Sequence, residues 1–241
     1  MRILIVLCLS LLSACTYFMP EKSSTWINQE AIDAALHNPN LREALLSKGP
    51  NLEWKLDPNN HTAQFSDGFE QAEGQLSTSD KGLWQVAFYQ EGTETLRQQG
   101  KILEQVESSN WPAQSFVRVK SDDLPLGESF ERAINKAYFG GAWLIQDGPN
   151  TGGKVIFQPD GQVSGLDEVS NYSLCLAGDC AATAGNYNVI LLENHSEDSQ
   201  AWIIERSNDQ LEIFSALNKA GDDSSIQKGT RRWLLTRIPS A

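Results

Sequence analysis

The chain has 241 residues, and its 31 Asp and Glu outnumber its 19 Lys and Arg, which gives a formal net charge of −12 at pH 7. This acidic balance argues against nucleic acid and anionic lipid surfaces as partners, because both repel a negatively charged protein. A hydrophobic content of 40% with seven Trp is enough for a folded core and excludes general disorder.

The chain opens with the layout of a secretory signal. Arg2 supplies a positive charge, residues 3–12 are almost wholly apolar, and Ser13 and Ala14 are small residues suited to a cleavage point. The apolar stretch is about half the ~20 residues that a spanning helix needs, so we expect residues 1–14 to be removed. The alternative, a buried N-terminal strand or helix, does not explain Arg2.

Residues 12–15, Leu-Ser-Ala-Cys, resemble the lipobox of bacterial lipoproteins. The resemblance implies a diacylglycerol thioether on Cys15, cleavage before it, and acylation of the new amino group. A single acyl chain holds a protein only marginally, at about 0.8 kcal/mol per buried methylene, whereas three chains make a lasting anchor. Thr16 stands where Asp would retain a lipoprotein in the inner membrane, so the resemblance implies the outer membrane, with the folded part facing the periplasm or the surface.

Helical patterns follow a polar tether at residues 15–24. Residues 32–36 place apolar side chains on one helical face, and Asn38-Pro39 suits the start of a second helix that ends near Ser47. A third helix is predicted over residues 128–138, where the apolar residues share one face and two glycines follow.

Most of the remaining sequence has the pattern of β-strands. Apolar and polar residues alternate, as at Leu52, Trp54 and Leu56, which favours antiparallel strands closing on a core. The predicted fold class is α+β and mainly antiparallel β, with short N-terminal helices followed by one or two small barrel-like or sandwich-like modules. We expect a helical segment plus a first β module in residues 25–125, and a helix plus a C-terminal β module in residues 126–241.

Two segments indicate an internal repeat. Residues 54–74 and 143–165 each contain a Trp, a turn, a strand with Phe, an Asp-Gly pair and a further Gly. A coincidence of turn-rich sequence is the alternative. Residues 155–165 also resemble the strand–turn–strand of META-type domains in other envelope lipoproteins. The family continues with a Cys-Asn pair where this chain has Leu166-Asp167, so no function is carried over.

The last two cysteines are predicted to form a structural disulfide. Cys8 leaves with the signal and Cys15 carries lipid, so Cys175 and Cys180 remain as a pair in an oxidising compartment. Gly178-Asp179 between them suits a turn, and we expect the bridge to close a hairpin tip. A redox or metal site is the alternative, although redox motifs usually hold their Cys two residues apart.

Residue patterns for catalysis are sparse. Residues 148–155 approach a phosphate-binding loop, but Val155 replaces its hydroxyl residue and a strand follows instead of a helix. The three His lie far apart, and no Gly-x-Ser-x-Gly elbow is present. Hydrolysis would therefore rest on paired carboxylates. The acidic pairs at 122–123, 197–198 and 222–223 fall in polar segments that favour solubility or weak cation binding. No cofactor or metal site is predicted.

Tryptophan is the remaining candidate for contacts. Five of the seven Trp occupy the apolar phase of their strands and are predicted to be core residues. Trp26 and Trp111 fall outside that pattern, and Trp111 before a Pro in a loop is the candidate exposed contact.

The leading hypothesis is a non-catalytic envelope role: binding a protein, glycan or small molecule, or supporting an envelope assembly. The alternatives are a carboxylate-dependent glycan hydrolase, which needs two buried carboxylates about 5–9 Å apart in a cleft, and a lipocalin-like carrier, which needs an apolar cavity of several hundred cubic ångströms.

Overall fold

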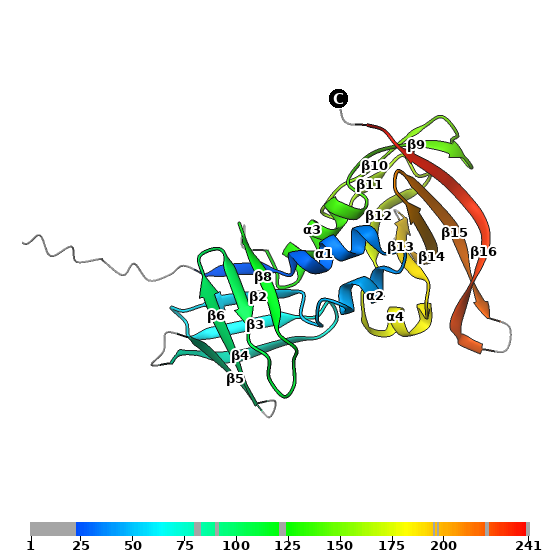
Figure 1. The fold of residues 1–241 in the computed structure, drawn as a ribbon. Coiled ribbons are helices and arrows are strands. Elements are labelled where there is room, and N and C mark those ends of the chain that lie inside the picture. Colours follow the sequence, from blue (N-terminus) through cyan, green and yellow to red (C-terminus); the bar gives the residue numbers. More distant parts are fainter. Residues whose placement is uncertain are drawn as a thin grey trace, which may run out of the picture.

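The computed structural model describes residues 23–79, 83–89, 92–120, 124–194, 196, 198–219 and 222–239. The described chain forms two antiparallel, barrel-like sheets with helices between them (Figure 1). The mainly antiparallel β architecture predicted from sequence is confirmed. The signal-like segment 1–14, Cys15 and most of the tether lie outside the described residues, as do His195 and the acidic residues 122, 123 and 197.

The first barrel is closed and contains eight strands. Each strand pairs with the next along the chain, and the first also pairs with the last. Closure leaves no open sheet edge for pairing with another chain. The strands are β1 (Ser24–Ile27), β2 (Glu53–Asp57), β3 (Thr62–Ser66), β4 (Gln71–Thr78), β5 (Trp84–Phe88), β6 (Gly92–Gln99), β7 (Ile102–Gln105) and β8 (Gln114–Val119).

Strand β1 and the helices after it differ from the predicted order. Residues 24–27 were assigned to the tether and a helical segment, but they form a buried strand in which Trp26 lies opposite Trp54. The helices α1 (Gln29–His37) and α2 (Leu41–Leu46) are inserted between β1 and β2. Asn40, not Asn38, caps the second helix, because its side chain accepts from the Glu43 amide at 2.9 Å.

The second barrel is an eight-stranded sheet in the order β11-β10-β9-β16-β15-β14-β13-β12. A bridge between Gln162 and Asn171 joins its two ends and curls the sheet toward closure. The strands are β9 (Gly141–Asp147), β10 (Lys154–Phe157), β11 (Val163–Ser164), β12 (Val169–Leu174), β13 (Asn188–Asn194), β14 (Ser199–Ser207), β15 (Gln210–Lys219) and β16 (Asp222–Arg237).

Helix α3 (Glu128–Tyr138) connects the two barrels, and its prediction is confirmed. Its N-cap, Gly127, has no side chain to satisfy the first amides. Glu53 of the first barrel accepts from the Phe130 amide at 2.8 Å instead. At the other end, Arg237 of the second barrel donates to the carbonyls of Tyr138 and Gly140. A carboxylate at the N-terminus and a guanidinium at the C-terminus both complement the helix dipole, so α3 is bonded to one barrel at each end.

The disulfide between Cys175 and Cys180 is confirmed, with Cα atoms 5.8 Å apart. Its predicted place at a hairpin tip is wrong, because the intervening residues lead into helix α4 (Gly178–Ala184). The helix contacts β13 and β16, and its Ala181 and Ala184 share an apolar cluster with Val189 of β13 and Ile203 of β14.

Candidate functional site

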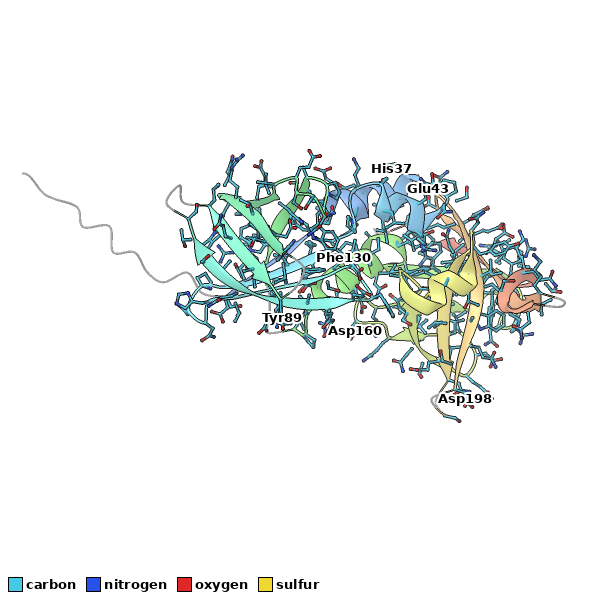
Figure 2. The ribbon with its side chains drawn as sticks, turned by 90° about the horizontal axis from the view of Figure 1, so that it is seen from below. His37, Glu43, Tyr89, Phe130, Asp160 and Asp198 are labelled. Carbon is cyan, nitrogen blue, oxygen red and sulfur yellow. A yellow bond between two sulfur atoms is a disulfide. The ribbon has the colours of Figure 1, made fainter. Side chains whose placement is uncertain are left out.

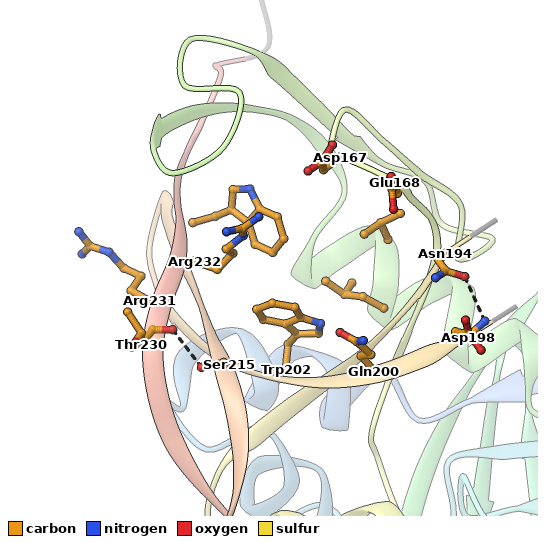
Figure 3. A pocket seen from close by; sticks show the side chains of 13 residues that line it. Asp167, Glu168, Asn194, Asp198, Gln200, Trp202, Ser215, Thr230, Arg231 and Arg232 are labelled. Atoms are coloured by element: carbon orange, nitrogen blue, oxygen red, sulfur yellow. Dashed lines mark hydrogen bonds between the residues drawn. The ribbon is translucent and has the colours of Figure 1, made fainter. Parts of the chain in front are cut away.

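The two ends of the second barrel are covered differently. Phe130, Ile134 and Tyr138 of α3 join the core at one end, beside Phe157 and the first residues of β9. Further along β16, away from Arg237, the opposite end holds an open pocket of about 440 Å³ (Figure 3). The loop before β12, the β13–β14 connection and strands β12 to β16 provide its lining: Asp167, Glu168, Val169, Leu192, Asn194, Asp198, Gln200, Trp202, Ser215, Thr230, Arg231, Arg232 and Trp233.

Two indole rings form the apolar part of this pocket. Trp202 and Trp233 have ring centroids 5.3 Å apart and ring planes tilted by 52°. The alternation of β14 and β16 places both side chains on the inner face, where Trp233 is 3% exposed and Trp202 is partly exposed. The indole N–H of Trp233 is buried and has no hydrogen-bond partner among the described residues. A buried donor of this kind is expected to meet a water molecule or a ligand.

Charged groups of both signs surround the indoles. Arg231 donates to Glu212 at 2.7 Å and to Asp147 at 3.1 Å, and these hydrogen bonds raise the pKa of its guanidinium. Its charge is therefore already balanced within the protein. Arg232 places its guanidinium 5.4 Å from the centroid of the Trp233 ring, a cation–π arrangement.

The acidic side of the rim comes from two connections. Asp167 and Glu168 are exposed before β12, and Asp198 is exposed before β14. Asn194 fixes the second connection, because its side-chain oxygen accepts from the backbone N–H of Asp198 at 3.1 Å (Figure 3). Apart from Arg231, the rim thus carries three carboxylates and one guanidinium. The pocket offers many donors and acceptors with a small excess of negative charge.

The buried carboxylates lie elsewhere and are used structurally. Glu53 holds α3, and Glu94 accepts from Ser108 at 2.9 Å and from Gln105 at 3.3 Å inside the first barrel. Burial raises the pKa of both carboxyl groups. Neither residue lines the pocket of the second barrel.

Two other depressions lie elsewhere on the described chain. A groove of about 820 Å³ lies between the end of α2 and the β7–β8 end of the first barrel, but the side chains of Gln105 and Gln114 in its lining already bond to Asn51. A pocket of about 440 Å³ beside α3 contains Glu131, whose pKa is raised by burial and by the neighbouring Glu128. Glu128 is itself paired with Arg132.

The residues singled out from sequence are dispersed. Trp111 is partly buried, and its ring packs edge to face on Phe65 at 5.4 Å. Trp26 is fully buried in the first barrel. The disulfide lies on the outside of the second barrel. His37 and His61 are exposed. The structure brings none of these residues into the pocket.

Sequence reasoning missed Trp202 and Trp233 as site residues and assigned them to the core. Their strand phase is that of core residues, and Trp233 is indeed buried. The alternation of side chains along a strand shows which residues point into a barrel. It does not show whether such a residue lies in the middle of the strand or at an end of the barrel. The adjacent Arg231-Arg232-Trp233 was the available signal, because basic residues beside an inward Trp place that Trp near a rim.

Within the described parts of the chain, no helix is long and apolar enough to cross a membrane. Among those same residues, no three His, Cys, Asp or Glu side chains gather as metal ligands would. The chain matches no protein-family model, no curated protein and no solved structure.

Proposed function

We propose that the protein is a lipid-anchored, non-catalytic binding protein of the outer membrane. Its ligand is held at the open end of the second barrel. The observation that carries the proposal is the pocket lined by Trp202 and Trp233, which combines apolar rings with polar side chains from two connections and from strands β13 to β16. Its volume of about 440 Å³ lies within the roughly 300–1,000 Å³ of small-ligand sites. The lipobox-like residues 12–15 support the anchor.

Binding accounts for the arrangement of carboxylates better than glycan hydrolysis does. A hydrolase needs one carboxyl group whose pKa is raised beside the scissile bond. Glu53 and Glu94 have raised pKa values, but their oxygens bond to α3 and to neighbouring side chains of the first barrel. Glu131 also has a raised pKa, but it is an exposed residue of α3, and the neighbouring Glu128 is already paired with Arg132. The carboxylates of the pocket are exposed rim residues.

A lipocalin-like carrier is also less well supported. The interior of the first barrel is filled by large buried side chains, which leaves the space expected for an apolar ligand occupied. These side chains are Trp26, Trp54, Leu56, Phe65, Leu76, Phe88, Leu96, Leu103 and Phe116. The second barrel is filled at its α3 end by Phe139, Phe157 and Tyr172, whose rings pack on one another.

The pocket is tested by photo-crosslinking in intact cells. A photoreactive amino acid is placed at Gln200, which is exposed and lines the pocket, and in a matched protein at Tyr89, which is 89% exposed. Tyr89 lies on the first barrel and Asp198 marks the pocket end of the second (Figure 2). We expect an adduct from position 200 that Trp202→Ala abolishes, and no such adduct from position 89. Absence of a Trp202-dependent adduct at position 200 would overturn the binding site.

The anchor is tested separately. Cys15→Ala removes the thiol that would carry the lipid, so we expect the protein to move from the membrane fraction to the soluble fraction. Cys8→Ala is the matched control and should leave the protein in the membrane fraction. Retention of the Cys15→Ala protein in membranes contradicts the anchor.

A further inference from the structure

We infer that the ligand of this pocket is a neutral saccharide, one sugar ring of which stacks on Trp202. The inference rests on the proposed function and names the chemical class that its site would recognise. Three features of the pocket support it: a partly exposed indole, polar groups that can both donate and accept, and a rim charge that disfavours anions.

The exposed indole suits the apolar face of a pyranose. The ring of Trp202 packs against the buried ring of Trp233, which restricts its orientation before a ligand arrives. A rigid aromatic face presents a large contact area at a low cost in conformational entropy. The C–H face of a sugar ring is flat and of similar size, whereas an acyl chain would leave the surrounding charged groups without hydrogen-bond partners.

The polar groups match hydroxyls, which are both donors and acceptors. Gln200 supplies an amide group on one side of Trp202, and Asp198 supplies an acceptor there (Figure 3). Asn194 adds side-chain N–H donors on that side, because its oxygen already accepts from the backbone of Ser196 and Asp198. Arg232 supplies donors on the other side. A polyol can satisfy groups of both kinds at once.

The charge of the rim separates neutral sugars from anionic ones. Glu212 and Asp147 already balance Arg231, which leaves Arg232 facing Asp167, Glu168 and Asp198. A phosphate or uronate would approach three carboxylates and one available guanidinium, within a protein whose net charge is −12. We therefore expect neutral or N-acetylated sugars to bind better than acidic ones.

The test is isothermal titration calorimetry, which measures the binding affinity of the full-length lipidated protein in detergent micelles. Three probes are titrated: tri-N-acetylchitotriose, maltotriose and trigalacturonic acid. We expect at least one neutral trisaccharide to bind at least tenfold more tightly than the acidic one. Trp202→Ala should weaken that binding by about tenfold or more, which corresponds to about 1.4 kcal/mol. Trp202→Phe should retain most of it. Gln200→Ala, at an exposed position that leaves the core intact, should weaken it by about threefold to tenfold. Tyr89→Ala is the control and should change nothing.

The results test the saccharide inference and the proposed binding site separately. Binding of the acidic probe as tight as that of the neutral ones overturns the inference, as does neutral binding that is insensitive to both Trp202→Ala and Gln200→Ala. No binding of either neutral probe up to roughly 10 mM also overturns it. If the Trp202-dependent crosslink at position 200 is nevertheless present, the saccharide inference fails alone and the proposed function stands. If that crosslink is also absent, both fail.

Discussion

The two barrels share a strand arrangement and differ in how one end is finished. In the first barrel, Glu94, Gln105 and Asn51 form a buried network of side-chain hydrogen bonds inside the closed sheet. In the second, one end is left open above Trp202 and Trp233. The same strand order therefore gives one module with a closed, filled barrel and one module with an open pocket. The difference lies in a few inward side chains at the strand ends and not in the fold.

The correspondence between the barrels extends to individual strands. Trp54 on β2 and Trp143 on β9 both follow a helical segment, and both are fully buried. β1 lies between β2 and β8, as β16 lies between β9 and β15. The internal repeat predicted from residues 54–74 and 143–165 stays a prediction. The matching positions make this prediction more specific. The strand that corresponds to β1, at the start of the first unit, is β16, at the end of the second.

The largest losses of stability are expected from removing the two corresponding buried indoles, Trp54 in the first barrel and Trp143 in the second. Trp54→Ala and Trp143→Ala each empty a fully buried site and lose a hydrogen bond, to Gln105 at 3.4 Å and to the Phe139 carbonyl at 2.7 Å. Each should lower the free energy of unfolding by about 3–5 kcal/mol. Hydrogen exchange should show Trp54→Ala loosening the first barrel. Trp143→Ala should loosen the second barrel together with α1 and α3, because Trp143 shares a core with those helices. Equal loosening of both barrels by Trp54→Ala would contradict separate cores.

The contact that joins the barrels through α3 should have the next largest effect. Glu53→Ala leaves the first amides of the helix without their acceptor and should cost about 2 kcal/mol. Glu53→Gln keeps an acceptor oxygen and should cost less. Urea unfolding measures both, and Glu104→Gln, a partly exposed β7 carboxylate, is the control. A cost for Glu53→Gln equal to that of Glu53→Ala would show that charge, and not the acceptor, holds the helix.

The sequence predicted what depends on local pattern. Alternation identified the strands, and the apolar face and glycine stop identified α3. It did not predict β1, because a four-residue strand has too little pattern and becomes recognisable only when β2 and β8 leave a gap between them. The disulfide was predicted from cysteine spacing, but the helix at Gly178 was not, because Gly and Asp favour a turn as readily as the first turn of a helix.

The candidate site was less accessible than the fold. Its residues come from segments centred on 168, 198 and 232, which only the curling of the eight-stranded sheet brings together. The same holds for Glu53 and Phe130, whose hydrogen bond spans 77 positions of sequence. Such long-range pairs carry no local signal, so sequence analysis predicted the apolar phase of Trp202 and not its place at a rim.

The disulfide should have a smaller effect than the core or α3. Cys175 and Cys180 close a short loop, so a Cys175→Ala/Cys180→Ala protein should lose about 1–2 kcal/mol of stability. The loop lies against the first barrel, because Gly178 leaves no room for a side chain beside the ring of Phe69 in the β3–β4 turn. Hydrogen exchange should therefore increase in the β3–β4 turn as well as in α4. Phe69→Ala with the disulfide intact is the matched comparison, and it should affect the turn but leave α4 protected.

The smallest effect is on the pH dependence of the free energy of unfolding, to which buried carboxyl groups of the first barrel contribute. Burial raises the pKa of Glu94 above its ordinary 4.5 in the folded protein, so the folded state keeps a proton that the unfolded chain has already lost. The free energy of unfolding should therefore fall as pH rises from about 4.5 through the raised pKa. Glu94→Gln should flatten this dependence and be more favourable at pH 7 than at pH 4. Glu53 contributes with the same sign, so its Gln variant should flatten a further part of the slope. Gln200→Ala in the second barrel titrates nothing and should keep the wild-type slope in urea unfolding at each pH. A slope unchanged by Glu94→Gln would mean that the buried network of the first barrel holds this carboxylate charged.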